Sequence, residues 1–102
     1  MEVVSTKINN IIIEGYRGDY ILETIEKTGD FYEGSILNNW SPIIGNPNVI
    51  FDIGSNIGNH AIYWATHLNP LAIYAFEPYP DNFSRLKNNV TNNSLNTIIT
   101  PI

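Results

Sequence analysis

The chain has 102 residues, with ten acidic residues against five basic ones, a formal net charge of −5 and no cysteine. This length predicts one domain, and the lack of cysteine excludes disulfides and thiolate sites. The acidic balance argues against a nucleic-acid groove, which relies on clustered lysine and arginine. No apolar run approaches the roughly 18 residues of a membrane span, and no signal-peptide pattern opens the chain. We therefore expect a cytoplasmic protein that binds neither nucleic acid nor membranes.

Residues 1–45 are predicted to form a cover segment for the rest of the chain. Apolar residues at 3–4 and 11–13 flank a polar stretch, which predicts two short strands, as a hairpin or a cover strand. Asp19 is the residue type of a helix N-cap, and Gly29 is the type that ends a helix. A helix is therefore expected between them.

A second, shorter helix is predicted to carry Ile36, Leu37 and Trp40. It is expected to end near Ser41 and Pro42, because the residue that precedes a proline avoids helical geometry. The turn residues that follow lead into the next strand.

Residues 46–102 are predicted to form a βαβαβ half of an α/β fold. The expected elements are a strand at 49–53, a helix at about 58–68, a strand at 71–76, a helix at about 80–91 and a strand at about 97–100. The strands are unbroken apolar runs, which is typical of parallel strands covered on both faces. Right-handed crossovers place them in the order 3-2-1.

The first of these strands runs into a loop with glycines at 54 and 58, and the second strand ends on Glu77. Glycine lets the backbone pass close to a ligand, and the helix after the loop presents free N–H groups at its first turn. An acid at the end of the neighbouring strand can accept hydrogen bonds from both hydroxyls of a ribose. The pattern therefore predicts a nucleotide-binding unit.

The loop lacks the G-x-G-x-x-G spacing of dinucleotide-binding folds and begins with Asp52, an acid that suits a ligand with a cationic part. Three segments stand in register: Phe51–His60, Phe76-Glu77-Pro78, and Pro80-x-Asn82-Phe83-x-x-Leu86-x-x-Asn89-Val90-x-x-Asn93. Together they resemble the class I S-adenosylmethionine-dependent methyltransferases, and among them the FkbM family. The resemblance runs from about Gly29 to the last residue.

This resemblance implies S-adenosyl-L-methionine as the cofactor and the N-terminal half of a Rossmann-like class I methyltransferase fold. Gly54 and Gly58 would let the methionine portion pass close to the loop. Side-chain hydrogen bonds along the same loop are expected from Ser55, Asn56 and Asn59. For Asp52 two interpretations stay open: a ligand of the cofactor's amino group, or a buried cap on the N–H groups of the loop.

Glu77 is expected to hold the ribose, and Pro78 or Tyr79 to pack on the adenine, although Pro78 is equally compatible with a simple turn. Glu33 belongs to a Tyr-Glu pair that FkbM-like sequences have ahead of the first strand; it would line the cofactor pocket or lie exposed at a helix start. His60, beside the loop, is a further candidate cofactor contact. The two histidines lack metal-ligand spacing, and no residue is identified as the general base.

FkbM-like enzymes methylate hydroxyls of sugars and secondary metabolites, so the resemblance implies O-methylation of a small-molecule or glycan acceptor. In the family fold the sheet continues beyond the third strand; we therefore expect 1–102 to be a truncated domain that is inactive alone. The open edge of strand 49–53 predicts a homo-oligomer. Two alternatives remain: half of an NAD(P)-dependent oxidoreductase, and a non-catalytic nucleotide-binding or interaction module.

Overall fold

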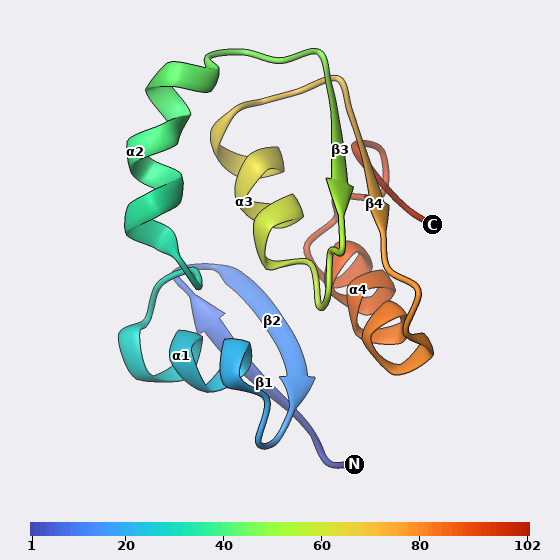
Figure 1. Ribbon diagram of the computed structural model, residues 1–102. Coiled ribbons are helices and arrows are strands. Elements are labelled where there is room, and N and C mark those ends of the chain that lie inside the picture. Colours follow the sequence, from blue (N-terminus) through green and yellow to red (C-terminus); the bar gives the residue numbers. More distant parts are fainter.

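The computed structural model describes residues 1–102 and contains the helices and strands that the sequence predicts (Figure 1). The N-terminal elements are β1 (Val3–Ile8), β2 (Ile11–Tyr16), α1 (Tyr20–Thr28) and α2 (Gly34–Ile44). The elements that follow are β3 (Val49–Ile53), α3 (Asn59–His67), β4 (Ala72–Phe76), α4 (Pro80–Asn92) and β5 (Ile99–Pro101). None of the helices has the length and apolar character that a membrane span requires.

β1 and β2 form an antiparallel hairpin, in which Val3 pairs with Tyr16 and Ile8 pairs with Ile11. Asn9 turns the chain with a φ of 54°. Tight hairpin turns need a positive φ, and asparagine tolerates it better than most residues. Of the two predicted arrangements of this segment, the structure has the hairpin.

Both ends of α1 follow the sequence signals. The Oδ2 atom of Asp19 accepts a hydrogen bond from the N–H of Leu22 at 2.9 Å, which satisfies one of the free donors of the first turn. Gly29 ends the helix in a left-handed conformation with a φ of 69°, and its N–H donates to the carbonyl of Ile25. The predicted N-cap and C-cap are therefore confirmed.

The predicted end of the second helix is wrong, because α2 continues through Pro42 to Ile44. Proline lacks an N–H and so removes one helical hydrogen bond, but in the last turn the neighbouring bonds remain. The hydroxyl of Ser41 donates to the carbonyl of Leu37 at 2.8 Å, and the N–H of Gly45 donates to the carbonyl of Ser41 at 3.0 Å. These bonds hold the last turn in place.

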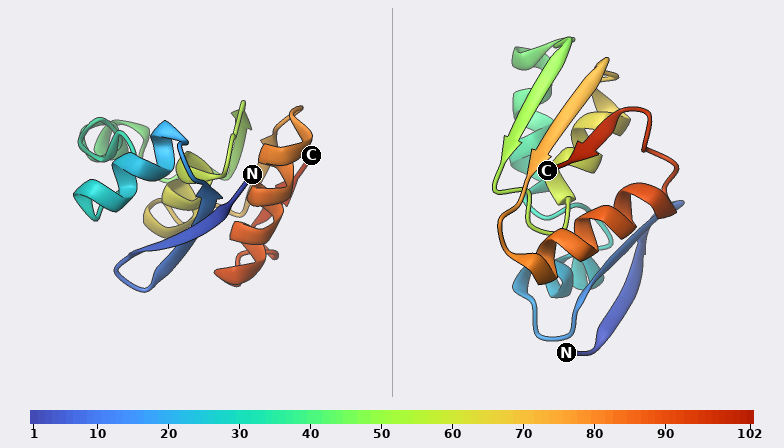
Figure 2. Two further views of the ribbon diagram at one scale, coloured as in Figure 1. Left: turned by 90° about the horizontal axis from the view of Figure 1, so that it is seen from below. Right: turned by 90° about the vertical axis from the view of Figure 1, so that its right-hand side faces the viewer.

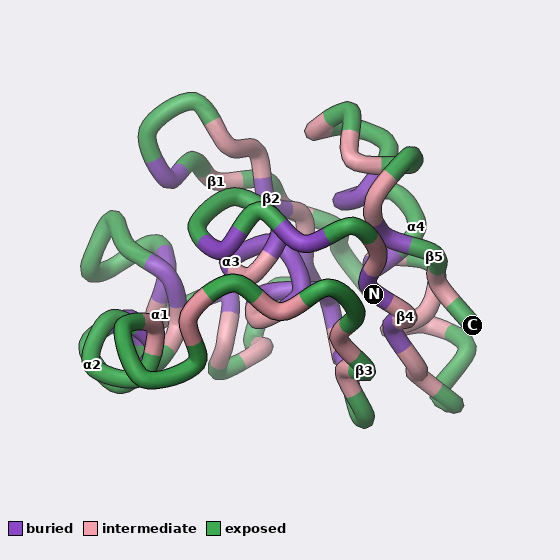
Figure 3. The backbone as a smooth tube through the Cα atoms, turned by 90° about the horizontal axis from the view of Figure 1, so that it is seen from above, coloured by how far each residue is buried: buried purple, intermediate pink, exposed green.

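The second sheet is parallel, with strand order β3-β4-β5, which confirms the predicted 3-2-1 order. Its register pairs Val49 with Ala72 and Ile73 with Ile99. Ile73, Ala75 and Ile99 are buried on the face that packs toward α3. One core of 16 buried residues joins this face with the hairpin, α1 and α4. Figure 3 shows the buried region near the centre of the molecule, whereas α2 is exposed along most of its length.

The opposite face of this sheet is bare, although unbroken apolar runs are typical of strands covered on both faces. In the right-hand view of Figure 2 the strands lie in front of α2 and α3, and no element covers their near side. On β3, Val49, Phe51 and Ile53 are 52%, 66% and 75% exposed. The ring of Phe51 packs edge-on against Tyr74 and Phe76 of β4. Right-handed crossovers that run in one direction place their helices on one side of the sheet, so the apolar side chains of the other side stay uncovered.

The outer edge of β2 is closed by asparagine side chains of α4 instead of by a third strand. The side chain of Asn89 accepts from the N–H of Glu14 at 2.7 Å and donates to its carbonyl at 2.9 Å. Asn93 makes the same two contacts with Ile12, at 2.8 Å and 2.7 Å. Because an open strand edge invites pairing with another chain, the two asparagines protect the hairpin as a paired strand would.

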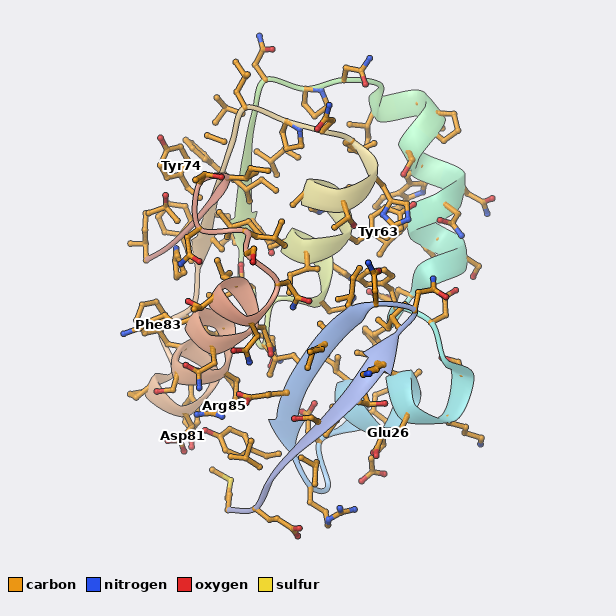
Figure 4. All side chains as sticks on the ribbon, turned by 180° about the vertical axis from the view of Figure 1, so that it is seen from behind. Glu26, Tyr63, Tyr74, Asp81, Phe83 and Arg85 are labelled. Atoms are coloured by element: carbon orange, nitrogen blue, oxygen red, sulfur yellow. The ribbon has the colours of Figure 1, made fainter.

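The spacing of the two asparagines on α4 matches the spacing of alternate residues on β2. Four residues of an α-helix rise about 6 Å, and two residues of a strand rise about 6.6 Å, so side chains at i and i+4 of α4 reach alternate residues of β2. Toward the start of α4, Arg85 pairs with the carboxylate of Glu14 at 2.8 Å, and the hydroxyl of Tyr16 donates to the carbonyl of Asp81 at 2.9 Å. Figure 4 shows Asp81 and Arg85 on the side of α4 that faces the hairpin.

We expect Asn89→Ala to lower the free energy of unfolding by about 3 kcal/mol or more, since each buried backbone group left without a partner costs about 1–3 kcal/mol. Urea denaturation followed by circular dichroism measures this change. Asn88→Ala is the matched control: Asn88 is exposed and has only one long contact, 3.4 Å to Glu14, so it should change stability by about 0.5 kcal/mol at most. Equal effects of the two substitutions would contradict the role of Asn89.

We expect the purified chain 1–102 to self-associate through β3 and the bare face of the sheet, because large exposed apolar patches mark association sites. Phe51→Lys should shift the chain toward an 11.5 kDa monomer in sedimentation velocity. Tyr20→Lys, which alters a 72% exposed aromatic residue on α1, is the control and should leave the association state unchanged. A wild-type chain that stays monomeric at tens of micromolar would show that this face does not associate.

Candidate functional site

The loop between β3 and α3 is folded back onto the end of β4. The N–H groups of Gly54 and Ser55 both donate to the carbonyl of Phe76 at 2.9 Å. Gly54 has a φ of 80°, and no atom lies within 4 Å of the place where a side chain would begin. Gly54 therefore leaves open space beside the loop.

Glu77, directly after β4, fixes the same loop from the other side. Its Oε1 atom accepts from the N–H of Asn56 at 2.8 Å, and its Oε2 atom accepts from the N–H of Tyr79 at 3.0 Å. Each carboxylate oxygen has a second lone pair, so Glu77 keeps the capacity to accept from two neighbouring hydroxyls. Glu77 thus supports the loop while its carboxylate remains partly exposed.

Asp52, near the end of β3, and Ser55 of the loop face each other. The hydroxyl of Ser55 donates to Oδ2 of Asp52 at 2.7 Å, and Ser55 is 5% exposed. This contact uses the only proton of the hydroxyl. The structure therefore places Asp52 as an internal support of the loop, close to the second of the two interpretations, although its partner is a side chain and not a backbone N–H.

Gly58 lies close to helix α4. It has a φ of 98°, and a side chain there would begin 3.0 Å from a methyl group of Leu86 in α4. A second contact of α4 with the loop comes from Asn89, which donates to the carbonyl of Ile57 at 2.7 Å. The group that closely approaches Gly58 is therefore helix α4, and not a ligand in open space.

Asn59 uses both polar atoms of its side chain on one residue. Its Oδ1 atom accepts from the N–H of Tyr32, and its Nδ2 atom donates to the carbonyl of Tyr32, both at 2.9 Å. Asn59 is 3% exposed. The sequence predicted a side chain that is free to bind a ligand; the structure instead has Asn59 holding the segment ahead of α2 against the start of α3.

Glu33 and His60 meet beside this contact. The Oε1 atom of Glu33 lies 3.0 Å from Nε2 of His60, and the two side chains are 38% and 37% exposed. Glu33 has a φ of 60° and makes no side-chain cap for α2. The two residues that the sequence singled out as uncertain candidates are therefore brought together, although 27 positions separate them.

A small cavity of about 100 Å³ lies among these elements. It is lined by Ile21, Tyr32, Gly54, Ser55, Asn56, Asn59 and His60. The Oδ1 atom of Asn56 is buried without a hydrogen-bond partner, which is rare for a buried polar atom. No lysine or arginine lines the cavity, so among its surroundings the N-terminus of α3 is the feature that favours an anionic group.

The remaining predicted site residues lie outside this cavity. Pro78 is exposed. Tyr79 lines a separate hollow of about 300 Å³ between the hairpin and the start of α4. Ile21 and Tyr32 line the cavity but were not predicted as site residues; the only signal for Tyr32 was its place next to Glu33.

The fold is that of the class I methyltransferases. The structure of TYW2 from Pyrococcus horikoshii in complex with MeSAdo matches with a TM-score of 0.70 and 14% identity, over 98% of this chain and 35% of that protein. TYW2 from M. jannaschii in complex with AdoMet matches with a TM-score of 0.64 and 22% identity, over 98% of this chain and 42% of that protein. TrmK from M. capricolum in complex with S-adenosyl-homocysteine matches with a TM-score of 0.59 and 25% identity, over 66% and 30% of the two chains.

Among characterised sequences, the chain is similar to the hexuronic acid methyltransferase AglP of Haloferax volcanii. The two are 50% identical over 42 residues, which are 41% of this chain and 16% of that enzyme. The chain therefore spans well under half the length of the relatives that it matches. No protein-family profile matches the chain.

The two glycines should respond differently to alanine. Both positive φ angles cost about 1–2 kcal/mol for a residue with a side chain, and at Gly58 the contact with Leu86 adds about 1–3 kcal/mol of overpacking. We expect Gly58→Ala to lower the melting temperature more than Gly54→Ala does. Differential scanning calorimetry measures both. Equal losses would show that Leu86 yields and that packing does not require Gly58.

Proposed function

We propose that the chain binds S-adenosyl-L-methionine and supplies the cofactor-binding part of a methyltransferase of the FkbM type. The observation that carries this proposal is the loop held between Phe76 and Glu77, next to a cavity with an unpartnered acceptor on Asn56. The complexes of the structural relatives with AdoMet, MeSAdo and S-adenosyl-homocysteine support the same ligand class.

Two parts of the site would bind two different parts of the cofactor. Glu77 would accept from the ribose hydroxyls through the lone pairs that its contacts with Asn56 and Tyr79 leave free. The cavity of about 100 Å³ is smaller than the roughly 300–1,000 Å³ of a site that encloses a whole small-molecule ligand. It is suited to one end of the cofactor, and the N-terminus of α3 beside it favours an anionic group.

The backbone N–H groups of the loop favour this cofactor over a dinucleotide. A pyrophosphate site needs successive N–H groups that point at the phosphate. Here the N–H groups of Gly54, Ser55 and Asn56 all donate to protein acceptors. These three N–H groups are therefore not free to bind the pyrophosphate of an NAD(P)-dependent oxidoreductase.

For the acceptor we propose a hydroxyl of a sugar or a related small molecule. The support is the similarity to a hexuronic acid methyltransferase over 42 residues, together with the FkbM-like motifs. When bound, S-adenosyl-L-methionine would supply an electrophilic methyl group, which would pass to the oxygen of a substrate hydroxyl as S-adenosylhomocysteine leaves and the hydroxyl loses its proton. The residues of this chain would contribute by holding the cofactor in attack geometry, which accounts for a large part of the acceleration in such reactions.

S-adenosylhomocysteine should bind to the chain in a calorimetric titration, whereas NADH should not. Glu77→Gln should weaken S-adenosylhomocysteine binding by about tenfold or more, because hydrogen bonds to a charged acceptor contribute about 1.5–3 kcal/mol each. Glu23→Gln, at an exposed position of α1, is the control with the same change of charge. Circular dichroism establishes that both variants are folded. Binding of NADH in preference to S-adenosylhomocysteine would overturn the proposed function.

A further inference from the structure

The segment Tyr32–Glu33 is held over the cavity by one buried side chain. Asn59 contacts both the N–H and the carbonyl of Tyr32 at 2.9 Å, in the manner of a neighbouring strand. A two-point contact fixes the direction of the backbone as well as its position. Asn59 is 3% exposed, so water does not compete for these bonds.

Directly after this contact, Glu33 has an unfavourable backbone conformation. Its φ of 60° and ψ of 28° are left-handed, which is uncommon for a residue other than glycine, asparagine or aspartate. The side chain gains no cap bond with α2 in return. Its carboxylate lies instead at His60, which lines the cavity. Such local strain persists where the surrounding contacts impose it, and the contact of Asn59 fixes Tyr32, the residue that directly precedes Glu33.

The groups at this end of the cavity complement an α-amino acid. The carboxylate of Glu33 and the unpartnered Oδ1 of Asn56 are acceptors suited to an ammonium group. The first turn of α3, which begins at Asn59, presents N–H groups suited to a carboxylate. The cavity and its rim at His60 therefore offer both acceptors and donors, a combination that matches the two charges of a zwitterion.

We propose that Asn59 is a positioning residue, which holds Glu33 so that the cavity recognises the zwitterionic amino-acid end of the cofactor. This proposal rests on the proposed function and deepens it. The side chain of Asn59 does not bind the ligand, because both of its polar atoms are bound to Tyr32; it acts through Glu33, at the cost of backbone strain in Glu33.

The test compares two ligands by nuclear magnetic resonance titration of the 102-residue chain. S-adenosylhomocysteine has the amino-acid end, whereas 5′-methylthioadenosine has the same adenosine part and lacks that end. The wild-type chain should bind S-adenosylhomocysteine about tenfold more tightly or better, as expected for added charge-assisted hydrogen bonds.

Glu33→Gly should separate stability from binding. Glycine adopts a positive φ without strain, so the melting temperature should rise. The affinity for S-adenosylhomocysteine should fall to that for 5′-methylthioadenosine, which should itself stay unchanged. Glu33→Gln keeps the side-chain length and should weaken the binding of S-adenosylhomocysteine but not that of 5′-methylthioadenosine. Glu26→Gln, an exposed position on α1, is its control and should change neither affinity.

Asn59→Ala should weaken S-adenosylhomocysteine selectively, and the double variant Asn59→Ala/Glu33→Gly should lose no more than either single variant, since both changes act on one contact. If the losses of affinity are additive, or if Asn59→Ala weakens the binding of both ligands equally, Asn59 has only a structural role. If Asn59→Ala does not fold, the two Glu33 variants still decide the matter: unchanged S-adenosylhomocysteine affinity in both overturns the proposal. If the wild-type chain binds both ligands equally, the amino-acid site is refuted and the proposed function stands; if it binds neither, the proposed function fails.

Discussion

The arrangement of the molecule depends on the hydrogen bonds of Asn89. This one side chain, fully buried, joins α4 to the edge of β2 through Glu14 and to the glycine loop through Ile57. The hairpin, the second crossover helix and the candidate site therefore meet at a single amide. Any motion of α4 relative to the hairpin would leave buried backbone groups without partners, which is among the more costly defects in a protein interior.

The loop is shaped by the protein before any ligand is present. Phe76 and Glu77 accept its first N–H groups, the hydroxyl of Ser55 is bound to Asp52, and Leu86 limits the space at Gly58. Binding then requires little further ordering of the backbone, and a preorganised site loses less conformational entropy on binding. The open surface that remains is concentrated at Gly54 and in the small cavity beside α3.

Features that depend on neighbouring residues were predictable from the sequence. The strands followed from apolar runs, the caps of α1 from Asp19 and Gly29, and the strand order from the handedness of crossovers. Pro42 shows the limit of such rules, because its effect depends on how many hydrogen bonds the last turn keeps. The bare side of the sheet cannot be read from a single strand, since an apolar run does not say which elements cover each face.

Features that depend on distant partners were not predictable. Asn59 has the residue type and place of a ligand contact, yet its partner is Tyr32, 27 residues earlier. Asn89 and Asn93 were recognised only as part of a motif, because their role needs the edge of β2 beside them. Tyr32 and Ile21 gave little or no signal, since an aromatic and an aliphatic residue near a helix start are most often core residues.

The matched rise of α4 and β2 restricts how this part of the chain can change length. One inserted residue between Asn89 and Asn93 would rotate every later side chain of α4 by about 100° around the helix axis, and Asn93 would leave the edge of β2. The hairpin turn at Asn9 lies beyond the last of these contacts. Insertions and deletions are therefore compatible with that turn, but not with the segment of α4 whose side chains bind the edge of β2.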